Sequence, residues 1–367
     1  MRATLGRRTG ATLRLAGPLL ALSCLAAAPA AGAAGAPSTT PAPTSPAPTA
    51  STPAPAAAPA PAAGTIRLVL QRVGGRPRFA LVGQRIVVRG VVIPYVAGQT
   101  VKLSFYREGR KVAVKLAGVQ ALGNGAGQFH VSFASADAGL VQVRAAHYAT
   151  AAQLAYSARS EAVRFVNTNL GLGARGQSVR LLQSELNVLH YAVPLSGVLD
   201  EGTGQALVAY RKMTGQERIP YAGRRVFALL GRGAGAFHVR YRHDGRHVEG
   251  DLTRQVLAEI EPGGRVHKLY TMSSGKPSTP TVIGRFSVYR KEPGVNSEGM
   301  VDSNYFIRGY AIHGYPEVPT YAASHGCLRV PIPDAPAIWS WVHEGTPVDV
   351  YNEGGGGSKH VRGNAGP

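Results

Sequence analysis

Cysteine is scarce in this chain of 367 residues, which contains only Cys24 and Cys327. Exported proteins usually use cysteine in pairs, as disulfides, and a chain with two cysteines cannot form a disulfide-rich fold. Cys24 lies in an N-terminal segment that we expect to be removed. Cys327 would then be the single thiol of the mature protein, and such a thiol is either buried and inert or reactive. Cys327 is therefore the first candidate functional residue.

Acidic residues are also few. The chain has 20 Asp and Glu against 40 Lys and Arg, a formal net charge of +20, and no acidic residue precedes Gly64. A large positive charge favours anionic partners. For an exported protein we expect an acidic wall polymer or an anionic membrane surface rather than nucleic acid. The alternative is that the charge serves only solubility.

A long hydrophobic run is missing. The N-terminal apolar run, residues 15–28, is too short for a stable membrane span and contains Gly17 and Pro18. It follows a basic start and precedes small residues that offer A-x-A cleavage sites. This layout is typical of a secretory signal peptide. We predict a signal peptide over residues 1–35 and an extracytoplasmic protein, secreted or associated with the cell wall. An uncleaved signal would instead leave an N-terminal membrane anchor.

Residues 36–64 are almost entirely Ala, Pro, Thr and Ser, without charge. Such a segment buries too little apolar surface to offset its ordering entropy, and its prolines favour extended conformations. We predict a semi-rigid linker here. It would separate the export signal from the globular part of the protein.

Residues 65–166 contain short β-rich runs separated by Gly, Pro and Asn turns. The clearest runs are residues 66–70, 85–91, 101–106, 129–133 and 140–144. Short strands at regular spacing predict an N-terminal β-sandwich. No cluster of catalytic residue types occurs in this segment, so an accessory domain is the interpretation.

Residues 167–232 change to a helical period. Val179, Leu182, Leu186 and Leu189 recur on one helix face, and Asp200 can cap a second helix. Val226, Phe227 and Leu230 indicate a third helix. The frame formed by Gly176, Val179, Leu182, Gln183, Leu186, Gly197, Leu199, Asp200, Thr203 and Ala206 resembles the three-helix peptidoglycan-binding domain. This resemblance implies a small all-α domain that binds wall polymer. Arg211 stands where that family commonly has Gln, and a purely structural role is the alternative.

Residues 237–352 return to strands. Residues 255–260 and 265–270 predict a hairpin across the Pro-Gly-Gly turn at 262–264. Residues 286–289, 311–313 and 348–351 predict further strands, and residues 335–342 predict one short helix. The Gly-rich residues 353–367 predict a disordered tail. The chain is thus expected to be multidomain.

The chemistry of the last segment is concentrated in two motifs. These are His313-Gly314 and Ser324-His325-Gly326-Cys327-Leu328-Arg329. A thiol is a weak nucleophile until it loses its proton, and a nearby imidazole promotes that loss. Gly326 allows a tight turn beside the sulfur, where backbone N–H groups can face an oxyanion. Arg329 adds a fixed charge suited to a substrate carboxylate. The plainer readings are a buried cysteine, a structural His325 and a surface ion pair of Arg329.

These motifs, together with residues 251–257, 272–276, 279–286 and 310–314, resemble the L,D-transpeptidase catalytic domain. The resemblance implies a mainly β, sandwich-like catalytic domain over residues 237–352. It implies that His313 activates Cys327, that the Gly314 carbonyl orients this base, and that residues 325–327 form the oxyanion-binding turn. The catalytic residues would be Cys327, His313, His325 and Gly326, and Arg329, Ser324 and Gly314 would shape the substrate-binding site.

The reaction implied by the resemblance starts from a peptidoglycan stem tetrapeptide. Cys327 would attack its third residue, release the terminal D-alanine and form a thioester, and an amine would then take the acyl group. No metal or organic cofactor is implied, and carbapenem-type inhibitors are expected to acylate the thiol.

Other readings of the same residues stay open. Water could replace the amine, which would give an L,D-carboxypeptidase. A papain-like or other thiol wall hydrolase is less consistent, because papain-like enzymes place Cys before His in the chain. His313, His325 and Cys327 could hold zinc, with residues 325 and 327 on one face of a strand, although a fourth ligand is not evident. A non-catalytic wall-binding protein is the last alternative.

Overall fold

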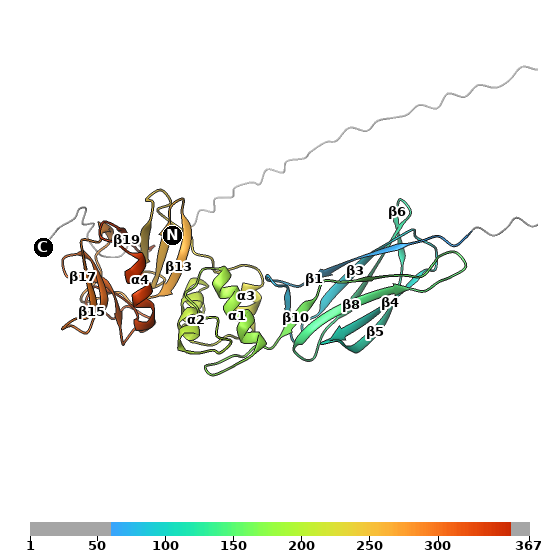
Figure 1. Cartoon of the computed structure of the whole chain (residues 1–367), viewed down its shortest axis with the longest axis horizontal. Coiled ribbons are helices and arrows are strands. Elements are labelled where there is room, and N and C mark those ends of the chain that lie inside the picture. The colour runs from blue at the N-terminus through green and yellow to red at the C-terminus, as the bar shows by residue number, and fades with distance from the viewer. Residues whose placement is uncertain (1–59, 354–367) are drawn as a thin grey trace, which may run out of the picture. The chain divides into compact units, whose positions relative to one another are not determined.

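The computed structural model describes residues 60–353 (Figure 1). The predicted signal peptide (residues 1–35), most of the predicted linker and nearly all of the predicted tail lie outside the described residues. Ala62, at the end of the predicted linker, pairs with Gln153 in an isolated bridge. The chain therefore joins the first β region before residue 65. All described residues belong to one compact unit of the chain.

Residues 65–166 form two sheets. The first has the order β1 (Thr65–Gln71), β3 (Ile86–Ile93), β7 (Ala126–Phe133), β6 (Gln120–Gly123). The second has the order β2 (Phe79–Leu81), β10 (Val163–Val166), β8 (Gly139–His147), β4 (Thr100–Arg107), β5 (Arg110–Gly118), with β9 (Tyr156–Arg159) also paired to β8. Alternate residues of both sheets share one apolar core, for example Val88 and Val131 from the first and Leu103 and Val143 from the second. The predicted runs are confirmed as β1, β3, β4, β7 and β8.

Three helices follow: α1 (Gln177–Val188), α2 (Glu201–Met213) and α3 (Arg224–Leu230). Val179, Leu182 and Leu186 are fully buried on one face of α1, as their spacing predicts. The Asp200 carboxylate accepts a hydrogen bond from the Thr203 N–H at 2.8 Å, so the predicted cap of the second helix is confirmed.

The C-terminal segment (residues 237–352) contains two further sheets. The five-stranded sheet has the order β13 (Arg265–Thr271), β12 (Val256–Glu261), β11 (His247–Asp251), β19 (Pro347–Tyr351), β14 (Gly284–Ser287). The four-stranded sheet has the order β15 (Arg290–Val295), β16 (Val301–Ile307), β17 (Tyr310–Tyr315), β18 (Leu328–Pro331). A 3-10 helix, η1 (Ile332–Asp334), leads into α4 (Ala335–Trp341). The predicted hairpin is confirmed as β12 and β13, which pair antiparallel.

The hairpin β12–β13 of the five-stranded sheet contributes to two apolar cores. Leu257 and Val350 belong to a core that also contains Ile312, Leu328 and Ile338, so this core lies between the two sheets and α4. Val256, Ala258, Ile260 and Leu269 belong instead to a core formed with the helices α1, α2 and α3. The helical segment thus packs on the outer face of the hairpin β12–β13.

Within residues 60–353, no helix is both long enough and apolar enough to span a membrane.

Candidate active site

Cys327 lies immediately before β18, beside the parallel strand β17. The register pairs Ile312 with Leu328 and His313 with Arg329, so Cys327 lies level with Ala311. The Ala311 N–H donates to the sulfur at 3.5 Å, and the thiol donates to the Gly309 carbonyl at 3.6 Å. Side chains two residues apart share a face of a strand. His313 is two residues from Ala311 on β17, so it lies on the same face of that strand as Ala311, the residue whose N–H contacts the sulfur.

His313 has a defined orientation. Its side chain is buried, with 2% of its surface exposed, and its Nδ1 lies 2.9 Å from the carbonyl oxygen of Gly314. A carbonyl oxygen can only accept, so we assign the proton to Nδ1 and a free lone pair to Nε2. Burial lowers the pKa of His313 to about 4, the Gly314 hydrogen bond opposes this shift, and the charge of Arg329 adds to it. The imidazole is therefore neutral at neutral pH and can accept a proton.

Cys327 is partly exposed, and it is the free thiol of the described residues. Burial raises its pKa, while the Ala311 N–H and the charge of Arg329 act in the opposite direction. At neutral pH the thiol and the imidazole are therefore both neutral. This arrangement suits proton transfer during nucleophilic attack rather than a preformed thiolate.

Hydrogen bonds of the Ser324 hydroxyl hold the cysteine loop (residues 324–327) in its conformation. Ser324 is fully buried, and its Oγ donates to the Cys327 carbonyl at 2.6 Å and accepts from the Gly326 N–H at 3.0 Å. The Ser324 hydroxyl is thus used within the loop. The Gly326 N–H is used in the same way, so it does not face an oxyanion in this structure.

Gly326 has a φ of +123°, a conformation that side chains rarely adopt. A Cβ at this position would overlap with the ring of Tyr310. Glycine is therefore required at residue 326 for two reasons, the backbone conformation and the packing of Tyr310 against the loop.

Residues 273–276 form hydrogen bonds with the cysteine loop and with the start of β18. The backbone of Ser273 exchanges two hydrogen bonds of 2.9 Å with that of Arg329, and the Lys276 N–H donates to the Ser324 carbonyl at 2.9 Å. Thr281 Oγ1 donates to the Gly326 carbonyl at 2.8 Å and accepts from the Gly275 N–H at 2.8 Å. The loop is thus fixed from both sides by backbone and hydroxyl groups.

Arg329 and His325 have different environments. The Arg329 guanidinium stacks on the ring of Tyr315, 3.9 Å from its centroid, and Tyr315 also packs edge-on against His313. His325 is exposed, and its Nε2 lies 3.1 Å from the ammonium of Lys276. Because an ammonium can only donate, Nε2 of His325 accepts this hydrogen bond. The exposed imidazole ring therefore lies next to the positive charge of Lys276.

Sequence reasoning did not assign roles to Ser273, Lys276 and Thr281. All three lie in segments that carry the family resemblance, but only the fold reveals that they contact residues 324–329. Their hydroxyl and backbone groups have no pattern that would distinguish them in a sequence from ordinary loop residues.

The strand geometry assumed for the zinc alternative is wrong. Residues 325–327 form bends before β18 instead of belonging to the strand. Within the described part of the chain, no group of three or more His, Cys, Asp or Glu side chains is arranged to hold a metal ion.

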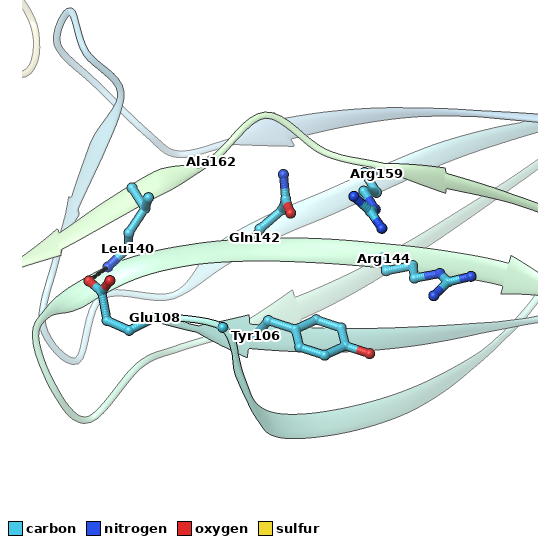
Figure 2. A pocket seen from close by; sticks show the side chains of 8 residues that line it. Tyr106, Glu108, Leu140, Gln142, Arg144, Arg159 and Ala162 are labelled. Atoms are coloured by element: carbon cyan, nitrogen blue, oxygen red, sulfur yellow. Dashed lines mark hydrogen bonds between the residues drawn. The ribbon is translucent and has the colours of Figure 1, made fainter.

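The N-terminal sandwich carries a separate hollow of about 420 Å³ (Figure 2). It is lined by Tyr106, Glu108, Gly109, Leu140, Gln142, Arg144, Arg159 and Ala162. Figure 2 shows Arg144 and Arg159 on neighbouring strands, with Glu108 near Leu140. The lining has no thiol and no imidazole, so it does not compete with Cys327 as a nucleophilic site.

Comparison with known proteins supports the same segment. Residues 245–350 match the family model of the L,D-transpeptidase catalytic domain. No curated protein matches the chain. Among solved structures, the chain is 32% identical to residues 123–326 of a Xylanimonas cellulosilytica L,D-transpeptidase, covering 51% of this chain and 98% of that one, with a TM-score of 0.48.

Two other solved structures are more distant. An Enterococcus faecium L,D-transpeptidase mutant is 27% identical, with 29% of this chain and 50% of that chain covered and a TM-score of 0.26. The LD transpeptidase LdtMt1 in complex with imipenem is 12% identical, with 77% of this chain and 97% of that chain covered and a TM-score of 0.26.

Proposed function

Since residues 245–350 belong to the L,D-transpeptidase catalytic-domain family, we propose that the protein is an exported cysteine L,D-transpeptidase. Its substrate would be the tetrapeptide stem of peptidoglycan. The observation that carries the proposal is the His313 ring, whose Nδ1 is held by the Gly314 carbonyl on β17, the strand whose Ala311 N–H contacts the sulfur of Cys327. This leaves Nε2 as the base for the thiol.

The proposed reaction has two halves. In the first, Sγ of Cys327 attacks the carbonyl carbon of the third stem residue while the thiol proton passes to Nε2 of His313. The carbonyl electron pair moves to oxygen. When the tetrahedral intermediate collapses, the C–N bond breaks and the leaving amine of D-alanine takes the proton from His313. A thioester and a neutral imidazole remain.

In the second half an acceptor amine attacks the thioester. His313 removes the proton of the attacking nitrogen and returns it to the departing sulfur. A new amide forms and the thiol is restored, so no oxidant, metal or organic cofactor enters the balance.

The other residues of the site would act by position. Ser324 and Gly326 shape the cysteine loop and thereby aim the sulfur. Backbone N–H groups of the turn at residues 325–327 other than that of Gly326 would supply oxyanion donors once substrate is bound. We propose that Arg329, held over Tyr315, supplies positive charge beside the site. Because the hydroxyl of Ser324 is buried, we now assign it a positioning role instead of a substrate contact.

The predicted N-terminal signal, the basic net charge and the helical frame support a protein that works outside the cytoplasm on an anionic wall polymer. In α2, the Arg211 guanidinium donates to the backbone carbonyls of Glu217 and Tyr221. Arg211, which stands where the resembled family commonly has Gln, thus stabilises the helical segment itself. Retention of the full chain on purified sacculi tests the wall-binding part of the proposal.

Mass analysis of muropeptides incubated with the purified protein tests the reaction. Cross-linked dimers with loss of D-alanine are expected, and Cys327→Ala is the matched control. Tripeptides without dimers would indicate a carboxypeptidase, in which water accepts the acyl group. Unchanged muropeptides with well-folded protein would exclude both activities on this substrate.

A further inference from the structure

Lys212 in the last turn of α2 inserts into the C-terminal segment. Only 4% of its surface is exposed, although its helix belongs to the helical segment. Its ammonium donates to the backbone carbonyl of Gln255 at 2.9 Å, to Thr271 Oγ1 at 2.7 Å and to the backbone carbonyl of Met272 at 2.9 Å. All three acceptors thus lie at the start of β12 or the end of β13.

The site satisfies the lysine in both of its protonation states. An ammonium has three N–H donors, which match the three acceptors. Burial and the nearby charge of Arg218 lower the pKa of Lys212 to about 7. A neutral amine could still donate to the two carbonyls while the Thr271 hydroxyl donates to its lone pair. The contact therefore does not depend on the charge of Lys212.

The acceptors of Lys212 are directly joined to residues 273–276. The side chain of Gln255 accepts from the Ser274 N–H at 2.8 Å and donates to the Ser274 hydroxyl at 2.7 Å. Met272 precedes Ser273, whose backbone pairs with Arg329. The next residues, Gly275 and Lys276, lie beside Ser324. A short chain of hydrogen bonds therefore leads from α2 to the cysteine loop.

A second contact reaches the same loop from its other side. The guanidinium of Arg218, in the segment after α2, donates to the backbone carbonyl of Thr320. The next residue, Tyr321, accepts from the hydroxyl of Ser273 at 2.7 Å. The helical segment is thus hydrogen-bonded both to Thr320, shortly before the cysteine loop, and to residues 271–272, which lead into the segment that contacts this loop.

We propose that Lys212 is a positioning residue for Cys327, so that the rate of thiol acylation depends on the docking of the helical segment. The effect on acylation rests on the proposed function. Lys212 acts by holding residues 271–276, which fix the position of the cysteine loop. It has no contact with reacting groups, and its loss changes the aim of the sulfur rather than the chemistry.

The test compares two variants of the full chain, Lys212→Met and Arg211→Met. Both remove a buried cation from the last turn of α2, but Arg211 donates only to carbonyls of the helical segment. Carbapenem acylation followed by intact-mass spectrometry gives the maximal rate constant and the half-saturating concentration separately. Hydrogen exchange of peptides that cover residues 271–276 and 321–329 reports the position of the loop.

Lys212→Met is expected to lower the maximal acylation rate constant by at least about tenfold, because small misplacements of reacting groups are costly. The half-saturating concentration should change little, and exchange should rise in both peptides. Arg211→Met is expected to change the rate by less than about twofold, whatever it does to thermal stability. Native acylation and exchange in Lys212→Met, or an equal rate loss in Arg211→Met, would overturn the proposal.

Two further measurements keep the result interpretable. If Lys212→Met does not fold, Thr271→Val removes one of the three acceptors with little change in volume and should give a smaller loss in the same direction. If the native protein itself is not acylated, the proposed function fails. The positioning role is then decided by hydrogen exchange and by the rate at which iodoacetamide alkylates Cys327 in the two variants.

Discussion

Replacing Gly326 by alanine is expected to disable the site through the shape of its loop. The φ of +123° at residue 326 is strained for any L side chain, which costs about 1–3 kcal/mol. The new methyl group would also overlap with the ring of Tyr310, and overpacking typically costs about 1–3 kcal/mol. The chain either absorbs both costs or moves the loop, and a loop shift of about 1 Å lowers the rate roughly 100-fold.

Two assays separate these outcomes. Urea unfolding measures the free energy of unfolding, which should fall by about 2–6 kcal/mol if the loop keeps its position. Carbapenem acylation followed by intact mass measures the rate loss if the loop moves instead. Gly309→Ala is the matched control, because Gly309 also lies beside the thiol but has open space around a new Cβ and an ordinary φ.

A double-mutant cycle tests the steric part. Tyr310→Ala removes the ring that the new methyl group meets, so Gly326→Ala in that background should lose less than it does in the native chain. If the changes in the free energy of unfolding of the two single variants simply add in the double variant, the overlap with Tyr310 does not contribute to the cost of Gly326→Ala. Native stability together with a native acylation rate in Gly326→Ala would refute the reasoning from this loop altogether.

The same site and its surroundings give four further predictions. Cys327→Ala should form no carbapenem adduct and no thioester while keeping its circular dichroism spectrum, and an adduct elsewhere in the chain would assign the nucleophile to another residue. Because the pKa of His313 is lowered to about 4, the acylation rate should stay nearly constant from about pH 5.5 to 8 and fall near pH 4. A tenfold rise in the rate per pH unit across this range would instead indicate a rate limited by free thiolate. His313→Ala should slow acylation far more than His325→Ala. Glu259 is buried and accepts from Tyr270, and burial raises its pKa to about 8 from an ordinary 4.5, so its proton stabilises the folded state fully below pH 4.5 and this contribution is lost as pH rises through 8. The stability of Glu259→Gln relative to the native chain should therefore increase by up to about 1.4 kcal/mol per pH unit between pH 5 and 8, measured by urea unfolding.

Two of the strands that the sequence did not predict, β5 and β15, share a physical cause. β5 is exposed along most of its length, at the edge of its sheet, so it lacks the alternation of buried and exposed residues that marks a strand. β15 is likewise an edge strand, mostly exposed, and contains Pro293 and Gly294. By contrast β3, β7 and β8 alternate buried and exposed residues, and they were predictable.

The helical segment shows the same division. The apolar period of α1 and the Asp200 cap of α2 are local features, and each is visible in a few neighbouring residues. The role of Lys212 is not visible in this way, because its three acceptors lie 43 to 60 residues away in the sequence. A lysine near the end of a helix normally indicates a solvated side chain that complements the helix dipole, and only the packing of α2 on β12–β13 reverses that interpretation.

By itself the sequence determined which residues could carry the chemistry. The scarcity of cysteine singled out Cys327, and the motif around it named His313, Gly326 and Arg329, because catalytic groups must be of particular types and glycine is needed where side chains cannot fit. The tertiary structure alone decided how these residues are held. It oriented the His313 ring on Gly314, used the hydroxyl of Ser324 within the cysteine loop, and bound that loop to residues 273–276 and, through them, to α2. The reason is that position depends on hydrogen bonds and contacts between segments far apart in the chain, which leave no periodic or local pattern in the sequence.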